Sequence, residues 1–286
     1  MPETLATFSD GTAVPTDGKF HVDPSCPQSS VRYLESWHPP GISEVLSGGN
    51  TARLALLPDG TILKFVYDKD DHWAIKGLDI EHRILTALGS HERLIKYFGQ
   101  HEYGLRFQFE ANGDIRRYFS RTDFKVIPIQ QRKKWVQQAA ESVVFIHSKD
   151  VIHCDLHPNN FLLDDKLNLR LCDFAGSLLG ELDGKAMEST PFFLPRDPLS
   201  TPNTKSDLFA LGSVMYYIMA GCEPYDGLSE DEITACYTRG DFPDVDEFDC
   251  GQTISGCWTG NFNSALEVIT SLSGNAAWEV SKISTA

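Results

Sequence analysis

The sequence has too few basic residues to bind nucleic acid or anionic membranes through charge alone. Among its 286 residues, 25 are Lys or Arg and 40 are Asp or Glu, which gives a formal net charge of −15 at pH 7. A chain with this charge repels phosphate backbones and anionic lipid. We therefore expect neither nucleic acid nor a membrane as a partner, although local charge still permits a nucleotide to bind.

Long apolar segments are also missing. The longest mostly apolar stretch, Leu208–Gly221, has fourteen residues, whereas a helix that crosses a bilayer needs about 20. We predict a buried core helix at this position. The first twenty residues have neither a basic start nor an apolar run, so we expect no secretory signal.

The cysteines do not form a metal-binding pattern. There are seven of them, an odd number, and none belongs to a Cys-x-x-Cys pair. This pattern argues against a structural zinc site, and without a secretory signal it favours reduced thiols in a cytoplasmic protein, with the nucleus as the alternative. The cysteines stand at positions 26, 154, 172, 222, 236, 250 and 257.

The composition is that of a globular chain, with 41% hydrophobic and 23% charged residues. Residues 1–40 carry Pro, Ser, Thr, Asp and Gly with little periodicity, so we predict a flexible lead-in. Two short apolar runs, Arg53–Leu57 and Thr61–Tyr67, are split by the residues Pro-Asp-Gly. This arrangement is typical of a β-hairpin.

The spacing of apolar residues predicts the other elements. Helices are predicted at 73–88, 131–147 and 207–221, and strands around 94–100, around 105–110 and between 151 and 172. An acidic, partly helical tail follows. A β-rich first part and a helical second part predict two lobes with a cleft between them.

The most specific motif lies in the second part. The segment His153–Asn160 has the sequence His-Cys-Asp-Leu-His-Pro-Asn-Asn, and Asp173, Phe174 and Ala175 follow thirteen residues after it. It resembles the protein-kinase catalytic loop, His-Arg-Asp-x-x-x-x-Asn, followed by the metal-binding Asp-Phe-Gly. A carboxylate and an amide five residues apart, then a second carboxylate after two short strands, rarely arise together by chance.

Matching residues stand upstream in the order that this resemblance requires. Lys64 takes the place of the family's phosphate-binding lysine, and Glu81 follows seventeen residues later within the predicted helix. Residues 47–52 resemble a degenerate glycine-rich loop. Any one of these residues alone would be an ordinary surface charge or turn, so the joint order carries the inference.

The resemblance covers roughly residues 44–260, and the segments 171–177 and 205–213 look particularly like those of fungal protein kinases. It implies an α+β bilobal fold, with a small β-rich N-terminal lobe that holds one helix at about 41–110. A mainly helical C-terminal lobe, shortened at its end, would follow at about 111–286.

The same resemblance implies ATP as phosphoryl donor, with Mg²⁺ or alternatively Mn²⁺. Lys64 would hold the α- and β-phosphates and would itself be held by Glu81. Asp155 would accept the proton of the attacking hydroxyl. Asn160 and Asp173 would supply the oxygen ligands that Mg²⁺ prefers.

Nucleotide contacts are implied at two further places. Backbone N–H groups of the glycine-rich loop would cap the phosphates, and backbone groups of the segment after the gatekeeper Phe107 would contact adenine. The candidate nucleotide-binding residues are Ser47, Gly48, Gly49, Asn50, Thr51, Lys64, Gln108 and Glu110.

Several positions depart from the family pattern. Cys154 replaces the arginine that grips a phosphorylated activation segment, so we expect no such switch. His157 replaces a lysine that neutralises the γ-phosphate, and a histidine is only partly charged near neutral pH. Ala175 replaces a glycine, and the glycine-rich loop is incomplete.

The end of the activation segment differs as well. Arg196 stands where the family has the glutamate of Ala-Pro-Glu, and no arginine occurs after Arg239 to pair with such a glutamate. Both halves of that ion pair are therefore absent together, so neither is left as an unpaired buried charge.

These observations leave three functions open. The intact set of five residues favours a kinase that transfers phosphate to Ser or Thr of a protein substrate, acting as a monomer. The departures favour a pseudokinase that binds nucleotide or partners without turnover. The catalytic-loop sequence is also similar to that of small-molecule phosphotransferases.

The acidic residues suggest a hypothesis about the substrate. Ten of them lie within 223–249, which favours substrates with basic residues near the acceptor.

Overall fold

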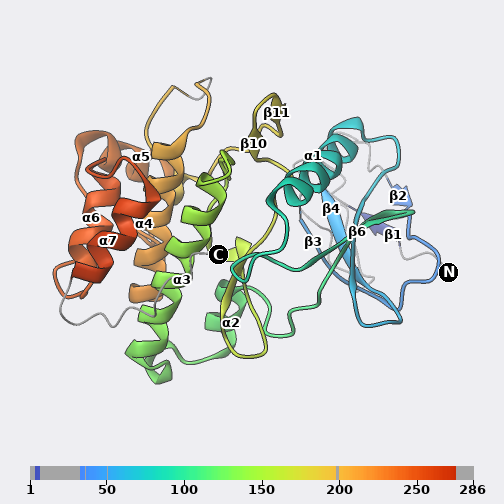
Figure 1. The fold of residues 1–286 in the computed structure, drawn as a ribbon, viewed down its shortest axis with the longest axis horizontal. Helices are drawn as coiled ribbons and strands as arrows, with labels where there is room; N and C mark the ends of the chain where they lie inside the picture. The colour runs from blue at the N-terminus through green and yellow to red at the C-terminus, as the bar shows by residue number, and fades with distance from the viewer. Residues whose placement is uncertain (1–3, 7–32, 36, 50, 198–199, 275–286) are drawn as a thin grey trace, which may run out of the picture.

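The computed structural model describes residues 4–6, 33–35, 37–49, 51–197 and 200–274. Its N-terminal lobe is built on a five-stranded antiparallel sheet with the strand order β3-β4-β5-β7-β6, and helix α1 packs against this sheet (Figure 1). The elements of this lobe are β3 (Glu44–Gly48), β4 (Ala52–Leu56), β5 (Ile62–Val66), α1 (His72–Leu88), β6 (Tyr97–His101) and β7 (Gly104–Phe107).

The β4–β5 hairpin positions Lys64. Its turn contains Gly60 with φ +79°, and the Asp59 carboxylate accepts hydrogen bonds from the Thr61 N–H (3.0 Å) and hydroxyl (2.6 Å). Because side chains alternate along a strand, the buried Leu63 and Phe65 point to one side of β5 and Lys64 to the other. The hairpin predicted from the sequence is confirmed.

Helix α1 presents Glu81 on its buried face. The Asp71 carboxylate caps the helix by accepting hydrogen bonds from the N–H groups of Trp73 and Ala74, and Gly89 ends it with φ +69°. Ile80, Ile84, Leu85 and Leu88 are buried. Glu81 therefore lies among apolar side chains, next to β5.

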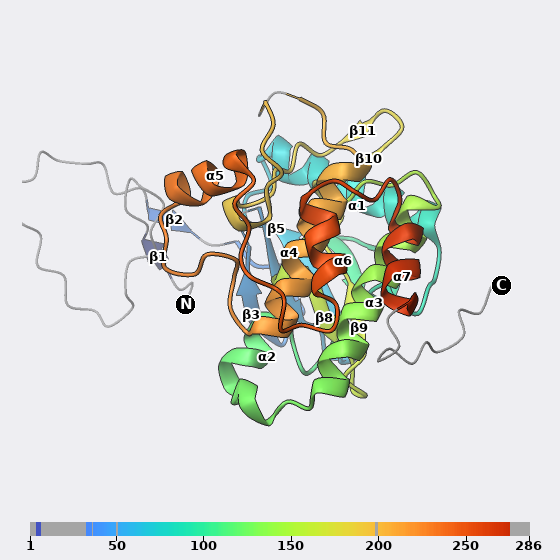
Figure 2. The ribbon, with the colours of Figure 1, turned by 90° about the vertical axis from the view of Figure 1, so that its left-hand side faces the viewer.

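The C-terminal lobe is mainly helical, with α4 at its centre between α3 and α6 (Figures 1 and 2). Most of α4 is buried, and its length exceeds the prediction at the start because Asn203 and Ser206 form a capping box. The helices are α2 (Ile115–Arg121), α3 (Ile129–His147), α4 (Thr204–Ala220), α5 (Glu230–Arg239), α6 (Gly251–Trp258) and α7 (Ala265–Gly274).

Short elements complete the chain. The sheet pairs are β1 (Thr4–Ala6) with β2 (Tyr33–Glu35), β8 (Phe161–Leu163) with β9 (Leu169–Leu171), and β10 (Leu178–Leu179) with β11 (Leu182–Asp183). The 3₁₀ turns are η1 (Phe124–Val126), η2 (Pro158–Asn160) and η3 (Thr190–Phe192). The predicted fold class is confirmed: a β-rich lobe with one helix precedes a helical lobe.

Two predicted strands are shorter than expected. The strand predicted around 94–100 begins at Tyr97, because Leu94 bridges to Leu171 and the Ile95 N–H bonds to the Leu171 carbonyl at 2.9 Å. These residues hydrogen-bond to the C-terminal lobe instead of β7. The strand predicted around 105–110 ends at Phe107, and the next three residues connect the lobes.

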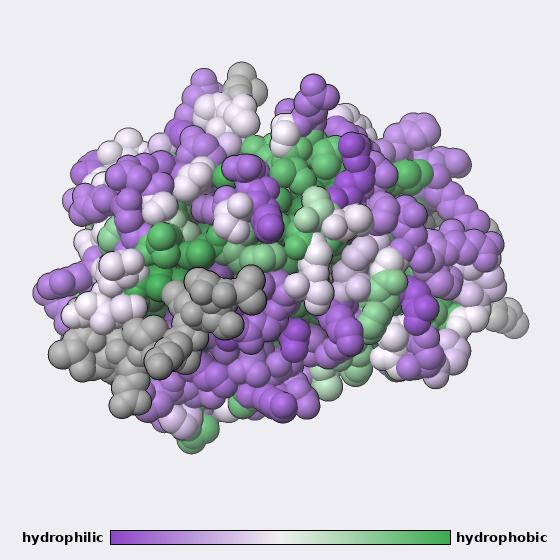
Figure 3. All heavy atoms as spheres, viewed as in Figure 1, coloured by the Kyte–Doolittle hydropathy of each residue, from purple (hydrophilic) through white to green (hydrophobic). Residues whose placement is uncertain are grey.

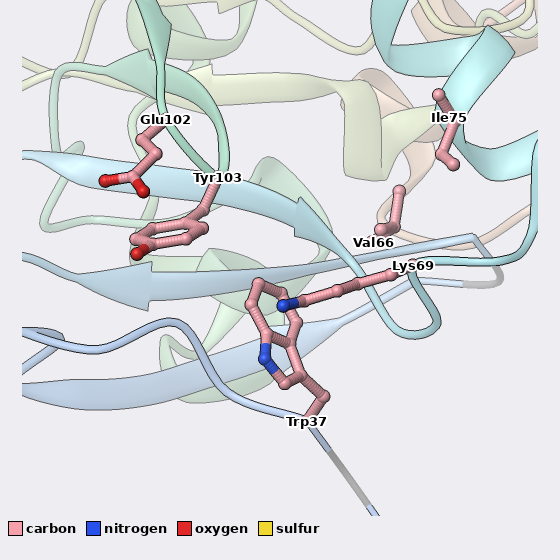
Figure 4. A pocket seen from close by; sticks show the side chains of 6 residues that line it. All are labelled: Trp37, Val66, Lys69, Ile75, Glu102 and Tyr103. Atoms are coloured by element: carbon pink, nitrogen blue, oxygen red, sulfur yellow. The ribbon is translucent and has the colours of Figure 1, made fainter.

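The prediction of a flexible lead-in at 1–40 falls largely outside the described residues. Within them, Trp37 packs edge-to-face on Phe65, with ring centroids 6.0 Å apart. A cavity of about 320 Å³ opens beside it, and Lys69 Nζ lies 3.9 Å from the Trp37 ring centroid (Figure 4). The chain's own lysine therefore covers one face of this indole.

Across the residues that the structure describes, no helix combines the length and apolarity that a membrane span requires. The predicted core helix is α4, whose two faces are both buried in the C-terminal lobe.

Candidate active site

Three charged side chains from distant parts of the chain meet between the lobes. Lys64 Nζ on β5 lies 2.6 Å from Glu81 Oε2 on α1 and 2.7 Å from Asp173 Oδ1 in the C-terminal lobe. Glu81 is almost fully buried, whereas the Asp173 side chain is 45% exposed. The lysine thus joins a buried carboxylate to one that still faces solvent.

The charges of this group stabilise one another. Burial by itself lowers the pKa of Lys64, but the nearby Asp173 and Glu81 carboxylates outweigh it, so the net shift of that pKa is upward. Burial would raise the pKa of Asp173, and the Lys64 ammonium overcomes this effect and lowers it. Both side chains are therefore charged at neutral pH.

The orientation of Asp173 is fixed by its neighbours. Phe174 is fully buried, its N–H donates to Glu81 Oε1 at 3.2 Å, and its ring lies edge-to-face on His153 with centroids 5.1 Å apart. Asp173 itself has φ +66°, a conformation that non-glycine residues adopt only when their surroundings hold it.

Asp207 on α4 holds the start of the segment His153–Asn160. This fully buried carboxylate accepts hydrogen bonds from the N–H groups of His153 (2.8 Å) and Cys154 (3.0 Å), and it lies 2.9 Å from His147 Nε2. Cys154 adopts φ +68° and is buried. The central helix therefore sets the backbone that presents Asp155.

The remaining polar residues of the segment surround Asp155. The Asn160 side-chain amide donates to the Asp155 carbonyl at 2.9 Å. His157 Nε2 lies 3.4 Å from Asp155 Oδ2, and His157 Nδ1 accepts from the Asn159 N–H at 3.3 Å. Because Nδ1 accepts, the proton of neutral His157 sits on Nε2 and faces the Asp155 carboxylate.

Asn160 and Asp173 offer two side-chain oxygen ligands for a divalent cation. Since the Asn160 NH₂ group is bonded to Asp155, its amide oxygen is left for a metal. Among the described residues, no cluster of three His, Cys, Asp or Glu side chains could hold a metal ion. This donor set suits Mg²⁺, which usually binds one or two protein oxygens together with phosphate and water.

The end of β3 and the loop from β3 to β4 carry the predicted phosphate-contacting residues. Ser47, Gly48 and Gly49 are exposed, as is Thr51, and Asn50 lies outside the described residues. The Tyr67 hydroxyl donates to the Gly49 carbonyl at 2.8 Å. A Cβ on Gly48 would lie 2.0 Å from that hydroxyl oxygen, so a side chain at this position would displace the Tyr67 ring from its contact with the loop.

The connection between the lobes contains the predicted adenine contacts. The Gln108 N–H donates to the Lys96 carbonyl at 2.9 Å, and the Glu110 carbonyl accepts from the Gly113 N–H at 2.9 Å. Phe107, the predicted gatekeeper, is buried. Of the two candidate residues, Gln108 thus has its N–H bonded within the chain, and Glu110 has its carbonyl bonded within the chain.

The side chain of Glu110 has surroundings that sequence reasoning missed. It is buried, with Oε1 3.3 Å from Arg170 Nε and 3.2 Å from Gln108 Nε2. Arg170 also contacts Asp164 at 3.3 Å. Burial raises the pKa of Glu110 to about 7 in spite of Arg170. No local pattern could reveal this, because Arg170 lies sixty residues further along the chain.

The segment from Glu188 to Arg196 contains an ion pair that the sequence did not predict. Arg196, at the position of the missing glutamate, lies 2.7 Å from Glu188 Oε2, and the Glu188 side chain is fully buried. The Arg196 guanidinium also stacks on Phe193, 4.4 Å from the ring centroid. Arg196 is therefore paired within the segment, and burial raises the pKa of Glu188.

Removing Arg196 should destabilise the protein strongly. Arg196→Met leaves the Glu188 carboxylate buried without its partner, which costs about 3–5 kcal/mol. The double variant Glu188→Gln/Arg196→Met removes the buried charge as well and should recover part of this loss. Urea unfolding measures both, and equal losses in the single and double variants would contradict the assignment.

The Glu110 carboxyl should make stability depend on pH. Its pKa rises from 4.5 to about 7 on folding, so between these values the folded protein binds more protons than the unfolded chain. The free energy of unfolding therefore falls as the pH rises through this range. Glu110→Gln removes the titrating group, so the variant does not lose this stability as the pH rises. The Tm of the variant minus the Tm of the wild type should therefore increase between about pH 5 and about pH 7.5. A Tm difference that does not change with pH would refute the raised pKa of Glu110.

Comparison with known proteins places this geometry in a family. Residues 61–255 match the family model described as "Protein kinase domain". Human receptor-interacting serine/threonine-protein kinase 1 is 25% identical over 202 residues, which cover 60% of this chain and 30% of that protein. RasGEF domain-containing serine/threonine-protein kinase X of Dictyostelium discoideum is 29% identical over 188 residues, 62% of this chain and 19% of that protein.

A rice relative has a shorter match. CBL-interacting protein kinase 24 of Oryza sativa subsp. japonica is 31% identical over 115 residues, 38% of this chain and 25% of that protein. The aligned regions thus span less than a third of each of these relatives. Because the matched family model covers more than half of the 286 residues, this chain belongs to the protein kinase family.

Proposed function

We propose that this chain is an ATP-dependent protein kinase that transfers the γ-phosphoryl group to Ser or Thr hydroxyls of a protein substrate. The observation that carries the proposal is the Lys64 ammonium held between Glu81 and Asp173 at 2.6 and 2.7 Å. It supports a site that is already arranged to receive phosphates, because positioning and charge supply most of the rate in phosphoryl transfer.

Each residue has one role in this proposal. Lys64 binds the α- and β-phosphates while Glu81 fixes its position. Asp155 orients the attacking hydroxyl and accepts its proton as the new O–P bond forms. Asn160 and Asp173 hold Mg²⁺, or Mn²⁺ in its place, and a cation there neutralises charge on the phosphate oxygens.

Adenine would be bound by the connection between the lobes. Because the Gln108 N–H and the Glu110 carbonyl are bonded within the chain, the Gln108 carbonyl and the Glu110 N–H are the groups proposed for adenine. Phosphates would meet the backbone of the loop from Ser47 to Thr51. The proposed kinase domain runs from about 41 to 286, with the lobes meeting near 110, and its likeness to fungal kinases stays a prediction.

Serine/threonine specificity rests on the names of the relatives described above. A protein substrate follows from the same family membership, and we propose a monomer in the cytoplasm. The alternative is a pseudokinase, which Ala175 and His157 favour because both depart from the family pattern. Measurement of turnover separates these two functions.

Phosphoryl transfer should depend on two carboxylates. The purified full chain, incubated with labelled ATP and Mg²⁺ or Mn²⁺, should label protein acceptors, and Asp155→Asn and Asp173→Asn should each lower the rate at least about 100-fold. Small alcohols serve as a second acceptor class. Nucleotide binding by thermal shift with no label incorporation would establish the pseudokinase, and labelling of small alcohols alone would overturn the protein substrate.

A permanent positive charge at position 157 should raise turnover. His157 Nε2 lies 3.4 Å from Asp155 Oδ2, at the position where the family has a lysine that neutralises the γ-phosphate. His157→Lys should therefore raise turnover, because phosphoryl transfer gains from cations near the developing charge. His157→Gln is the matched neutral control. Equal turnover in the wild type and both variants would show that charge at this position does not assist transfer.

A further inference from the structure

Positive charge is concentrated in one short part of this acidic chain. Residues 114–134 hold seven Lys or Arg and two Asp, although the whole chain carries a net charge of −15. This part comprises α2, η1 and the first turns of α3. A local excess of basic residues in an otherwise acidic protein marks a surface that attracts acidic groups.

Exposed apolar side chains lie within the same part. Val126 is 67% exposed and Ile129 is 39% exposed, whereas Ile127 between them is buried and anchors the connection. Figures 1 and 2 place α2 and this connection at the lower edge of the C-terminal lobe. Figure 3 shows apolar atoms at that edge among hydrophilic neighbours.

The basic side chains beside these apolar residues are available. Arg117 and Arg121 are four residues apart on α2 and therefore share a face, and Lys125 follows in η1. All three are exposed, and within the described part of the chain the structure gives none of them an ion pair. We call Arg117, Arg121, Lys125, Val126 and Ile129 the basic–apolar surface.

This surface begins close to the catalytic segment. Arg116, at the start of α2, donates to Asn159 Oδ1 at 2.9 Å and forms an ion pair with Glu223. Since α2 rises about 1.5 Å per residue, its seven residues lead from the catalytic segment to the surface over about 10 Å. An extended peptide spans this distance with about three or four residues.

Two acidic residues beside this region are paired with its basic residues. Arg116 forms an ion pair with Glu223, and Lys133 forms one with Asp249. The carboxylates of Asp114 and Asp123, which lie within the region, accept backbone N–H hydrogen bonds as caps of α2 and η1. The three exposed basic side chains outnumber these two carboxylates, so the local charge is positive, which is opposite to the hypothesis of basic substrates.

We propose that the basic–apolar surface docks an acidic segment of the protein substrate, with carboxylates against Arg117, Arg121 and Lys125 and an aliphatic side chain against Val126 and Ile129. The identity of the partner as a protein substrate rests on the proposed function. The closeness of α2 to Asn159 favours a peptide chain that also reaches Asp155 over a lipid surface.

Direct binding tests this docking independently of catalysis. The probe is a fluorescein-labelled peptide with five Glu or Asp residues around two leucines, and the protein is the full chain carrying Asp155→Asn, without ATP. Fluorescence anisotropy should show saturable binding that weakens with added salt. Arg121→Glu/Lys125→Glu should raise Kd at least tenfold, and Val126→Ser should raise it about threefold.

Matched controls carry the same changes elsewhere. Arg83→Glu/Lys149→Glu reverses two exposed charges on α1 and beyond the far end of α3, and Leu266→Ser removes an exposed aliphatic residue on α7. These variants should leave Kd within twofold of the parent. A peptide with Gln in place of its acidic residues should not bind. Thermal melting verifies that every variant folds.

Three results would overturn the proposal. One is an equal loss of binding in the control variants, which would indicate attraction by overall charge. Another is binding to phosphatidylserine vesicles but not to the peptide, which would make the surface a lipid contact. The last is concentration-dependent self-association lost in Arg121→Glu/Lys125→Glu, which would make the partner a second copy. Failure of phosphoryl transfer alone changes none of these measurements.

Discussion

The pairing of Lys64 with two carboxylates is the interaction on which the arrangement of the lobes depends. Lys64 and Glu81 belong to the N-terminal lobe, and Asp173 belongs to the C-terminal lobe. A buried lysine is costly unless it is paired, so the charge itself favours the position in which both carboxylates reach it. The bond from the Phe174 N–H to Glu81 Oε1 then links the backbone beside Asp173 to the same helix.

The second fixed point is Asp207 in the middle of the C-terminal lobe. Most of α4 is buried, and the Asp207 side chain on it is fully shielded from solvent. The Asp207 carboxylate holds the backbone N–H groups of His153 and Cys154. The Asp155 side chain beside them is held through its backbone and stays partly exposed.

Much of the fold could be predicted from the sequence because its signals are local. The β4–β5 hairpin follows from its turn residues, α1 and α3 from apolar spacing, and α4 from an apolar stretch too short for a bilayer. The limits of the strands could not be predicted, because Leu94 and Ile95 bond to Leu171 across the lobes. Tertiary pairing, which no local pattern records, decides where those strands begin.

The site shows the same division between features that the sequence predicts and features that tertiary contacts decide. The motifs and their order predicted Lys64, Glu81, Asp155, Asn160 and Asp173, and the structure brings Lys64, Glu81 and Asp173 into contact and bonds Asn160 to the residue Asp155. The Glu188–Arg196 ion pair and the Glu110–Arg170 contact were not predicted. Each joins a buried carboxylate to an arginine whose position depends on tertiary structure, Arg170 on β9 and Arg196 in the loop before α4. Such pairs become visible only once burial is known.

The three bonds around Glu81 and Lys64 also restrict how helix α1 can move. Lys76 on the same helix donates to the Asp183 carbonyl at 3.2 Å, so α1 is attached to the C-terminal lobe at a second place. Because Glu81 and Lys76 belong to one helix, a displacement of α1 would stretch both attachments at once. The position of the catalytic lysine and the conformation of the loop at Asp183 are therefore mechanically connected through this helix.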